Sequence, residues 1–523
     1  MKRLVAIVCF SFFILQAYSQ ATTRRFPASI NNSSINITAP FISLDGSTLL
    51  FTSDYADDGT LVYFSQRDAG DWKVPVELPK QFNAKTNFSK GYTLSADGKI
   101  LYLSSIKSGG VGGYDMWSCD IRGGELKNLY LPVNTKSHEG CPTFTTDGNT
   151  MYFMRCEKME RDKADKCKIM VSRKKQTGQW EEPTELPASI NTGNSQTPRI
   201  MADGETLIFS SNKITPNKGG MDLYVTKFKD GSWSNPLPMD FVNTAKDDQF
   251  VSAQANGRYL VMEAPGKFKS EVVEFLIPDD LRPKGVMKVD GMVKDINGAP
   301  TAAYLSVTDL FNNKRIFSGQ PAADGSFFFY LTEGGAYELS VDHAESSYTY
   351  YSKQYDLMAN TLLRNDKLNI VLKKLNAGDE LDLDALRFKP ETYELDHATS
   401  ELRRLSRLLK NSPGLIFEIQ VLLAGYVEDS VKSSPDLTEV VVDSTNVILE
   451  AIDSTGQMIT RDSLVIKTTY HNDRTEKQAN AIIDQLVALG TDRKNLSLFV
   501  NSRPEEVIEN RKTSVRLLAR KKK

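Results

Sequence analysis

The stretch Asp45-Gly46-Ser47-Thr48-Leu49-Leu50-Phe51 decides the fold, because its pattern recurs four more times in the first half of the 523-residue chain. The five turn pairs are Asp45-Gly46, Asp97-Gly98, Asp147-Gly148, Asp203-Gly204 and Asn256-Gly257, at intervals of 52, 50, 56 and 53 residues. Each pair precedes an apolar and aromatic run, which is typical of a tight hairpin turn, since Gly and Asn tolerate positive φ. A unit of about four short strands repeated at this interval predicts a β-propeller.

Further motifs keep the same phase as the turn pairs. Gly112-Gly113-Tyr114-Asp115 is echoed by Gly219-Gly220-Met221-Asp222, and W-x-x-P occurs at positions 72, 180 and 233. We interpret Asp115 and Asp222 as turn-capping residues rather than ligands. Residues 26–31 match residues 186–191, which end a repeat. The chain is therefore expected to enter in the middle of a blade and to close a ring of five blades, with six as the alternative.

Residues 26–280 resemble the TolB-like propeller repeats of envelope proteins. The resemblance rests on a Pro, then Asp-Gly, an aromatic strand and G-x-x-D, with Pro40, Pro142 and Pro198 at the Pro position in three of the five repeats. It implies a propeller at residues 20–283 with a rigid face for binding envelope proteins.

The first 19 residues have the pattern of a secretory signal peptide. Lys2 and Arg3 precede an apolar run at 4–15 and a small-x-small end at 17–19, so cleavage would leave Gln20 first. A membrane anchor is the alternative, but the run is too short to span comfortably. Cys9 lies inside the run without a lipoprotein signal. We expect an exported mature chain without a membrane span.

Export places the other four cysteines in an oxidising compartment. Cys156 and Cys167 flank a charged segment that has the pattern of a hairpin tip, so we predict a disulfide between them. Cys119 and Cys141 are candidates for a second bridge. The alternative for both pairs is buried free thiols.

The repeat stops near residue 283, and two smaller domains follow. At 284–376, strand-like runs alternate with Gly and Asn turns, which predicts a small β-sandwich. This segment resembles the carboxypeptidase regulatory-like family in its V-x-G-x-V-x-D and D-G-x-F-x-F motifs (289–295 and 324–329). The resemblance implies a prealbumin-like sandwich that acts as a spacer.

From residue 377 to 523 the apolar period changes to that of helices lying on a sheet. Leu402, Leu405, Leu408 and Leu409 line one predicted helix, and Ala479, Ile482, Ile483 and Leu486 line another. With the strand-like runs between them, this α/β segment resembles the OmpA C-terminal domain, a periplasmic module that holds peptidoglycan.

Two positions depart from the OmpA-like ligand site. The family's Asp aligns with Ala424 and its Arg with Gln478. We interpret Thr475-x-x-Gln478 as a helix capping box. Losing two charge-assisted hydrogen bonds should weaken binding by roughly 10²–10⁴. Peptidoglycan is therefore expected to bind poorly.

An insertion at about 427–470 interrupts this domain. It is rich in acidic residues and contains the runs Val440-Val441-Val442 and Leu464-Val465-Ile466, which predict an added hairpin. Two interpretations remain open, a solvated decoration and a partner surface that replaced the glycan site.

Composition and motifs limit the function. With 64 Lys+Arg against 66 Asp+Glu, a nucleic-acid-binding surface is not expected. The chain has only four His and lacks the G-x-S-x-G motif of hydrolases. We therefore expect that it is not an enzyme and that it binds no metal or cofactor. The domain order is similar to OmpA-family components of Bacteroidetes-type envelope and type IX secretion machinery. We therefore expect a multidomain, mainly β periplasmic scaffold associated with the outer membrane. The alternative is a propeller that binds a small ligand or glycan in its central channel.

Overall fold

The computed structural model describes residues 23–32, 35–56, 59–68, 70–358, 365–389, 392–396, 399–424, 431–432, 437–452, 454–503 and 512–522. The chain divides into two compact units, residues 1–287 (unit 1) and 288–523 (unit 2). The expected signal peptide lies outside the described residues. Among those described, no helix is long and apolar enough to cross a membrane.

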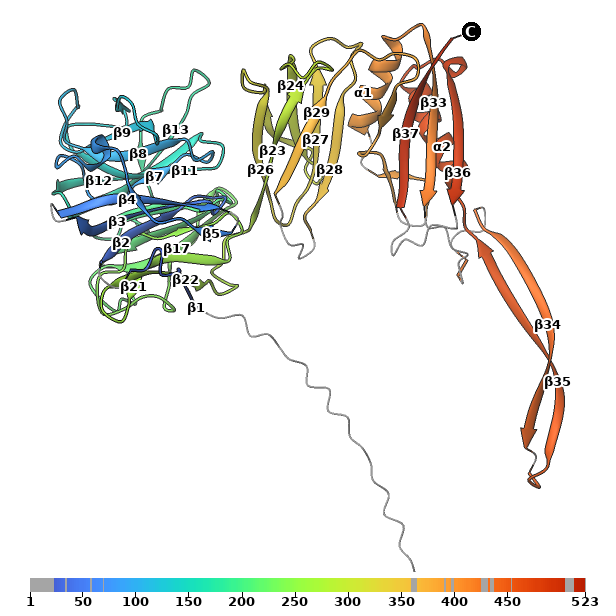
Figure 1. Cartoon of the computed structure of the whole chain (residues 1–523), viewed down its shortest axis with the longest axis horizontal. Helices are drawn as coiled ribbons and strands as arrows, with labels where there is room; N and C mark the ends of the chain where they lie inside the picture. Colours follow the sequence, from blue (N-terminus) through green and yellow to red (C-terminus); the bar gives the residue numbers. More distant parts are fainter. Residues whose placement is uncertain are drawn as a thin grey trace, which may run out of the picture. The chain divides into compact units, whose positions relative to one another are not determined.

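Unit 1 consists of antiparallel sheets that follow one another along the chain (Figure 1). Its described residues form five of them, which we number I to V. Sheet I contains β2 (Ile37–Ile42), β3 (Thr48–Ala56), β4 (Gly59–Asp68) and β5 (Asp71–Trp72), and β6 (Val76–Glu77) also pairs with β4. Sheet II contains β7 (Thr93–Leu94), β8 (Ile100–Ser105), β9 (Asp115–Asp120) and β10 (Lys127–Asn128), and sheet III contains β11 (His138–Phe144), β12 (Thr150–Met159), β13 (Ala164–Arg173) and β14 (Thr184–Glu185).

Sheet IV contains β15 (Ser195–Ile200), β16 (Thr206–Ser211), β17 (Asp222–Lys229) and β18 (Ser232–Trp233), and β19 (Leu237–Pro238) also pairs with β17. Sheet V contains β20 (Ser252–Ala253), β21 (Tyr259–Pro265), β22 (Ser270–Leu276) and β1 (Thr23–Arg25).

The N-terminal strand completes the last sheet. β1 pairs antiparallel with β22, with Thr23 opposite Phe275. Buried side chains also join each sheet to the next, and sheet V to sheet I. The shared clusters include Leu50 with Leu101, Met116 with Phe153, Tyr152 with Leu207, Leu223 with Leu260, and Val261 with Ile37. Unit 1 is therefore a mainly β, propeller-like body whose core lies between its sheets.

The five repeated turn pairs join the first and second strands of the five sheets. Each Gly has φ between +64° and +72°. The Asp or Asn before it accepts a hydrogen bond from the N–H two residues later at 3.0–3.2 Å. This local bond holds the turn and explains why the pair is repeated.

A second repeated feature is a residue with positive φ. It lies six residues before each turn pair, on or just before the first strand of each sheet. These residues have positive φ, between +47° and +74°, and are Ala39, Gly91, Cys141, Thr197 and Phe250. In sheets I, III and IV the strand register shifts there, as in a β-bulge.

A third repeated feature is an asparagine whose side-chain amide pairs with the main chain of each third strand. Each Oδ1 accepts from an N–H and each Nδ2 donates to the C=O of the same residue at 2.7–3.5 Å. The pairs are Asn31 with Val272, Asn83 with Val62, Asn134 with Met116, Asn191 with Ile169 and Asn243 with Leu223. Each clamp satisfies the N–H of the third-strand residue, whose carbonyl also accepts a hydrogen bond from a backbone N–H.

Unit 2 contains two sheets followed by an α/β domain. The first sheet is β26 (Ser326–Thr332), β23 (Val286–Lys294) and β29 (Asp366–Val371), and the second is β25 (Lys314–Gly319), β24 (Ala303–Asp309), β27 (Ala336–His343) and β28 (Tyr351–Asp356). We call these strands the sandwich. Burial alternates along them, as in β26, so each sheet packs one face into the core.

The α/β domain has a sheet of β30 (Glu380–Asp382), β37 (Lys512–Lys521), β33 (Leu415–Ala424) and β36 (Leu496–Arg503), and a small pair of β31 (Arg387–Phe388) and β32 (Leu395–Asp396). Helices α1 (Thr399–Lys410) and α2 (Thr475–Ala488) pack their apolar faces on this sheet. The leucines and isoleucines that sequence periodicity assigns to the two helices are all buried.

The insertion forms a two-stranded antiparallel hairpin, β34 (Glu439–Ile452) and β35 (Met458–His471), drawn as a long twisted ribbon in Figure 1. All 14 residues of each strand are paired without a register shift. The expected hairpin is therefore present.

Candidate functional site

The disulfide predicted from the sequence is confirmed. Cys156 of β12 and Cys167 of β13 lie directly opposite each other, with their Cα atoms 4.0 Å apart. Both side chains are buried against Phe88 and Tyr114. The bond therefore fixes the outer part of a hairpin that extends from sheet III.

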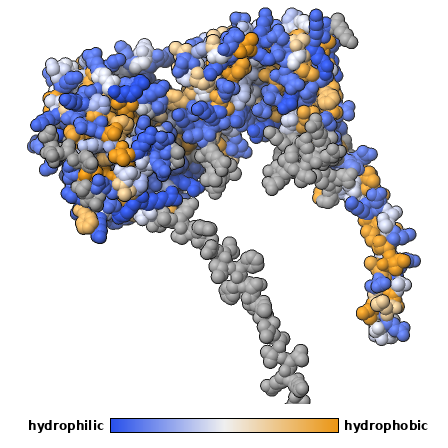
Figure 2. Space-filling model, viewed as in Figure 1, coloured by the Kyte–Doolittle hydropathy of each residue, from blue (hydrophilic) through white to orange (hydrophobic). Residues whose placement is uncertain are grey.

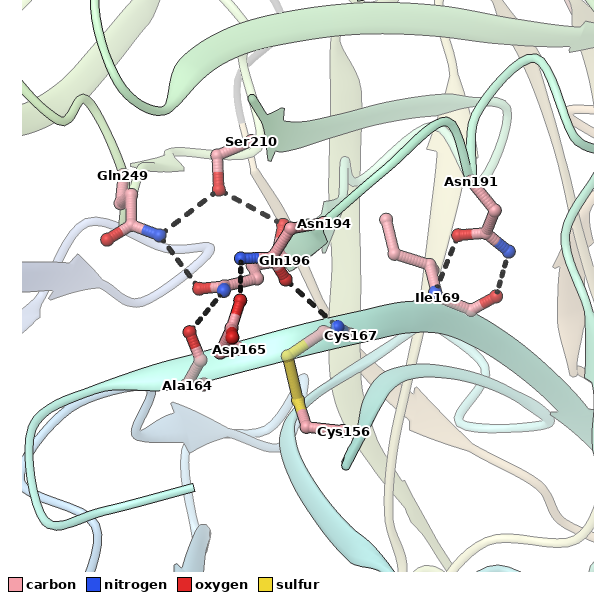
Figure 3. Close-up of a disulfide and its surroundings, with 10 residues drawn as sticks. All are labelled: Cys156, Ala164, Asp165, Cys167, Ile169, Asn191, Asn194, Gln196, Ser210 and Gln249. Carbon is pink, nitrogen blue, oxygen red and sulfur yellow. Dashed lines mark hydrogen bonds between the residues drawn. A yellow bond between two sulfur atoms is a disulfide. The ribbon is translucent and has the colours of Figure 1, made fainter. Parts of the chain in front are cut away.

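Amide side chains connect this hairpin to the neighbouring sheets (Figure 3). Asn194 accepts a hydrogen bond from the Cys167 N–H at 2.9 Å, and Gln196 Nε2 donates to the Ala164 carbonyl at 2.6 Å. Gln249, which precedes β20 of sheet V, donates to Gln196 Oε1 at 3.0 Å. These polar contacts thus join sheets III, IV and V beside the disulfide.

The second candidate bridge is not formed, since Cys119 and Cys141 are both free and buried. Cys119 packs between sheets I and II, whereas Cys141 occupies the positive-φ position of β11 in the cluster beside the disulfide. Because the two thiols belong to different clusters, they do not meet. Burial raises the pKa of the Cys141 thiol to about 12.

The first strands of all five sheets line a small central cavity of about 40 Å³. Arg199 of β15 lies in it: Nε donates to the Val251 carbonyl at 3.1 Å, Nη1 donates to Thr93 Oγ1 at 2.8 Å, and the guanidinium lies 4.8 Å from the Phe41 ring centre. Burial lowers the pKa of Arg199 to about 10. One side chain from sheet IV thus contacts residues of, or next to, the first strands of sheets V, II and I.

A larger cavity, of about 690 Å³, lies in unit 2, and we call it the unit 2 pocket. It is lined by β28, the segment between β30 and β32, the start of α2, and the ends of β33 and β37 that meet there. Its charged lining residues are Lys353, Arg387, Lys389, Arg474 and Asp384. Lys353 pairs with Asp366 and Lys389 with Glu394, each at 2.8 Å, so part of the positive charge of the lining is already compensated.

The two departures from the OmpA-like site fall at or beside this pocket. Leu423, next to Ala424, lines it, and so does Gln478 of α2. The Gln478 side chain is 4% exposed; its Nε2 donates to the Thr392 carbonyl at 3.3 Å, and no described residue donates to its Oε1. Arg474, one helical turn before Gln478, lines the same pocket. A guanidinium therefore remains near the position where the resemblance expects one.

The capping box expected at Thr475 and Gln478 is wrong. The N-cap of α2 is Arg474, which makes no side-chain cap, and the Gln478 side chain turns to Thr392. Thr475 Oγ1 donates to Asp473 Oδ1 at 2.9 Å instead. Asp473 also accepts from the Thr475 N–H at 3.0 Å, so the carboxylate before the helix satisfies that amide.

A buried polar cluster joins α1 to the sandwich. Arg404 forms an ion pair with Glu338 of β27 and lies 3.5 Å from Glu401. Ser400 Oγ lies 2.6 Å from both Glu338 oxygens, and the Tyr350 hydroxyl donates to Glu401 Oε1 at 2.9 Å. Burial raises the pKa of Glu401, and the Arg404 guanidinium opposes that rise. The cluster is a structural connection within unit 2 rather than an open site.

The aspartates of the G-x-x-D motifs cap their own loops, and Asp115 also accepts a hydrogen bond from Asn128 Nδ2 at 2.8 Å. Asp115 accepts from the N–H groups of Val111 and Gly112, and Asp222 accepts from those of Lys218 and Gly219. Among the described residues, no group of three or more His, Cys, Asp or Glu side chains could hold a metal ion.

No protein-family model and no curated protein matches this sequence. Among solved structures, the chain is similar to TolB from Acinetobacter baumannii (14% identity, 46% of this chain and 54% of that one, TM-score 0.31) and to putative TolB from Agrobacterium tumefaciens (18%, 57% and 90%, 0.28). It is also similar to an oligogalacturonate lyase from Vibrio parahaemolyticus (13%, 60% and 85%, 0.27). The chain thus spans about half the length of the Acinetobacter protein. TM-scores below 0.5 support no inference about activity.

Sequence reasoning missed Arg199, the role of Arg474, and the pair of Glu338 and Arg404. Arg199 had a local signal, since it follows the repeated Pro198 on a first strand. The other two had none, because their neighbours come from distant parts of the chain.

Proposed function

We propose that the protein is a non-enzymatic, exported scaffold of the cell envelope. In this proposal residues 20–283 form a closed five-bladed propeller that binds envelope proteins. Residues 284–376 are a regulatory-like spacer, and residues 377–523 are an OmpA-like module that places the chain near the outer membrane or peptidoglycan. The shared clusters between consecutive sheets, and between sheet V and sheet I, support five blades rather than six.

The observation that carries the scaffold function is the buried contact between the spacer and the α/β domain. Glu338 and Glu401 are 3% and 0% exposed, and both lie within ion-pair distance of Arg404. Removing one partner of such a pair leaves a buried charge without compensation, so the contact requires both partners. A fixed connection of this kind sets the distance between the spacer and the α/β domain. A scaffold requires such a fixed distance.

The ligand-binding alternative receives no support from the central channel. The described cavity there is about 40 Å³, whereas small-molecule pockets are typically ~300–1,000 Å³. Arg199 lies in this cavity and is held there by hydrogen bonds to the Val251 carbonyl and to Thr93 Oγ1.

The experiment is affinity purification of the tagged mature chain from its own envelope fraction, after crosslinking in intact cells. We expect envelope proteins to be recovered with the whole chain and, through the propeller, with residues 20–283. A matched sample carrying Arg404→Met should lose those partners that depend on the spacing within unit 2. Recovery of the chain alone, or turnover of a glycan by the purified protein, would contradict the proposal.

A further inference from the structure

The hairpin of β34 and β35 presents an unusual amount of apolar side-chain surface (Figure 2). In the part of the chain that the structure describes, the two strands pair only with each other. The exposed fractions of its large apolar side chains reach 60% for Val442, 71% for Ile448, 72% for Ile452 and 73% for Met458. Contiguous exposed apolar surface of this kind marks an interaction site.

The free edge of β34 lacks the features that normally keep strand edges apart. Residues 439–452 contain no Pro, Lys or Arg, and their pairing with β35 shows no bulge. β35, by contrast, carries Arg461 and Lys467. A long, regular edge whose charged residues are limited to Glu439, Asp443 and Glu450 is still a template for another strand. The open side of β34 is therefore the pairing edge.

The sequence of β34 identifies which strand fits. Two apolar triplets, Val440-Val441-Val442 and Val447-Ile448-Leu449, flank the polar segment Asp443-Ser444-Thr445-Asn446, with Glu439 and Glu450 outside them. The pattern reads almost the same in both directions. An antiparallel copy of the same strand can therefore place Val441 and Val442 opposite Leu449 and Ile448.

We propose that β34 pairs antiparallel with β34 of a second copy of this chain, giving a four-stranded sheet in the order β35-β34-β34-β35. With Thr445 on the two-fold axis, Val442 lies opposite Ile448 and Ser444 opposite Asn446 of the other copy. Asp443 then faces Val447 and Val440 faces Glu450, so no carboxylate lies directly opposite another.

The length of the strand is sufficient for a specific contact. Fourteen residues at ~3.4 Å each extend about 48 Å. A strip about 10 Å wide along that edge covers roughly 500 Å² per copy, or about 1,000 Å² in total, which is near the lower limit for a specific interface. The dimer should therefore dissociate on dilution.

Sedimentation velocity of residues 20–523 over a range of concentrations is the first test. We expect a monomer–dimer equilibrium for the native chain. Val442→Lys with Ile448→Lys places lysines opposite each other twice and should weaken the dimer about tenfold or more. Val442→Glu with Ile448→Lys has the same number of polar replacements but places Glu opposite Lys, and should restore the dimer.

Disulfide trapping tests the geometry independently of the lysine variants. Thr445→Cys, or Ser444→Cys for a register shifted by one pair, should give a crosslinked dimer on mild oxidation. Ser463→Cys lies on β35, away from the axis, and should not crosslink. A native chain that stays monomeric at about 100 μM, or a dimer that the lysine pair leaves unchanged, would overturn the proposal.

Discussion

Arg404 of α1 and Glu338 of β27 form a buried ion pair across 66 residues of sequence, and Glu401 lies beside them. Two carboxylates thus share one guanidinium in a place with little access to water. Loss of Arg404 would therefore leave both buried carboxylates without their cation.

Arg404→Met should lower the free energy of unfolding of unit 2 by about 3–5 kcal/mol at pH 8, because it leaves buried carboxylates without a cation. The loss should be smaller at pH 5. Burial already raises the pKa of Glu401 above its ordinary value. Without Arg404 the pKa of Glu401 rises further. Between the pKa of the unfolded chain, about 4.3, and the higher pKa of the folded state, folding takes up a proton. Lowering the pH through this range therefore favours folding.

Urea titration of the whole chain separates the two units, because all four Trp residues lie in unit 1. The variant should shift a transition seen by far-UV circular dichroism and leave the Trp fluorescence transition in place. Arg407→Met, which removes an exposed pair with Asp342, is the matched control and should cost less than about 1 kcal/mol. An equal loss of unfolding free energy at pH 5 and pH 8 would contradict the raised pKa of Glu401.

Replacing both Cys156 and Cys167 by Ser should destabilise unit 1 by about 2–3 kcal/mol, since the disulfide closes a short loop. Trp fluorescence during urea unfolding measures this loss. Peptide mapping should show the two cysteines linked before reduction and Cys119 and Cys141 as thiols. Alkylation of Cys156 and Cys167 without prior reduction would rule out the bond.

Gly91→Ala should be clearly more destabilising than Gly98→Ala. Both glycines have φ above +70°, so both substitutions strain the backbone by roughly 1 kcal/mol. A Cβ at Gly91 would also lie 2.4 Å from Cys141 Sγ, whereas one at Gly98 would meet nothing within 4 Å. We expect about 2–4 kcal/mol for Gly91→Ala, as for an overpacked core. Adding Cys141→Ala should recover part of it, and equal losses at both glycines would disprove the clash.

Peptidoglycan should sediment little of the native chain, because Ala424 and Gln478 stand where the OmpA-like resemblance expects an acid and a base. Ala424→Asp with Gln478→Arg should increase co-sedimentation if the pocket accepts both charges. Strong native binding that is abolished by Arg474→Ala would instead show that Arg474 replaces the expected arginine from one turn earlier.

The features that the sequence predicted correctly are local ones. The turn at Asp45-Gly46 depends on a hydrogen bond between residues two apart, and the disulfide connects facing residues of one hairpin. The capping box failed because Asp473, just outside the motif, satisfies the first amide of α2. The second cysteine pair failed because Cys119 and Cys141 enter different clusters of the core.

The features that sequence reasoning missed depend on distant partners. Asn31 clamps Val272 across 241 residues, and only the repeat of the asparagine hints at it. Arg474 lines the unit 2 pocket because it lies one helical turn before Gln478. A comparison that considers only the position of Gln478 does not detect it. Glu338 lies on β27 and Arg404 on α1, 66 residues apart, so no local pattern links them.

The pairing of β1 with β22 has a consequence for the order of folding. Thr23 meets Phe275 only after every intervening residue is available, so the last contact of unit 1 is also its longest loop closure. A chain delivered from its N-terminus would hold β1 without its partner until the whole of unit 1 had emerged. Contacts this far apart in sequence form slowly. Until then the edge of β22 stays open to other strands, and a newly delivered chain would need protection from aggregation there.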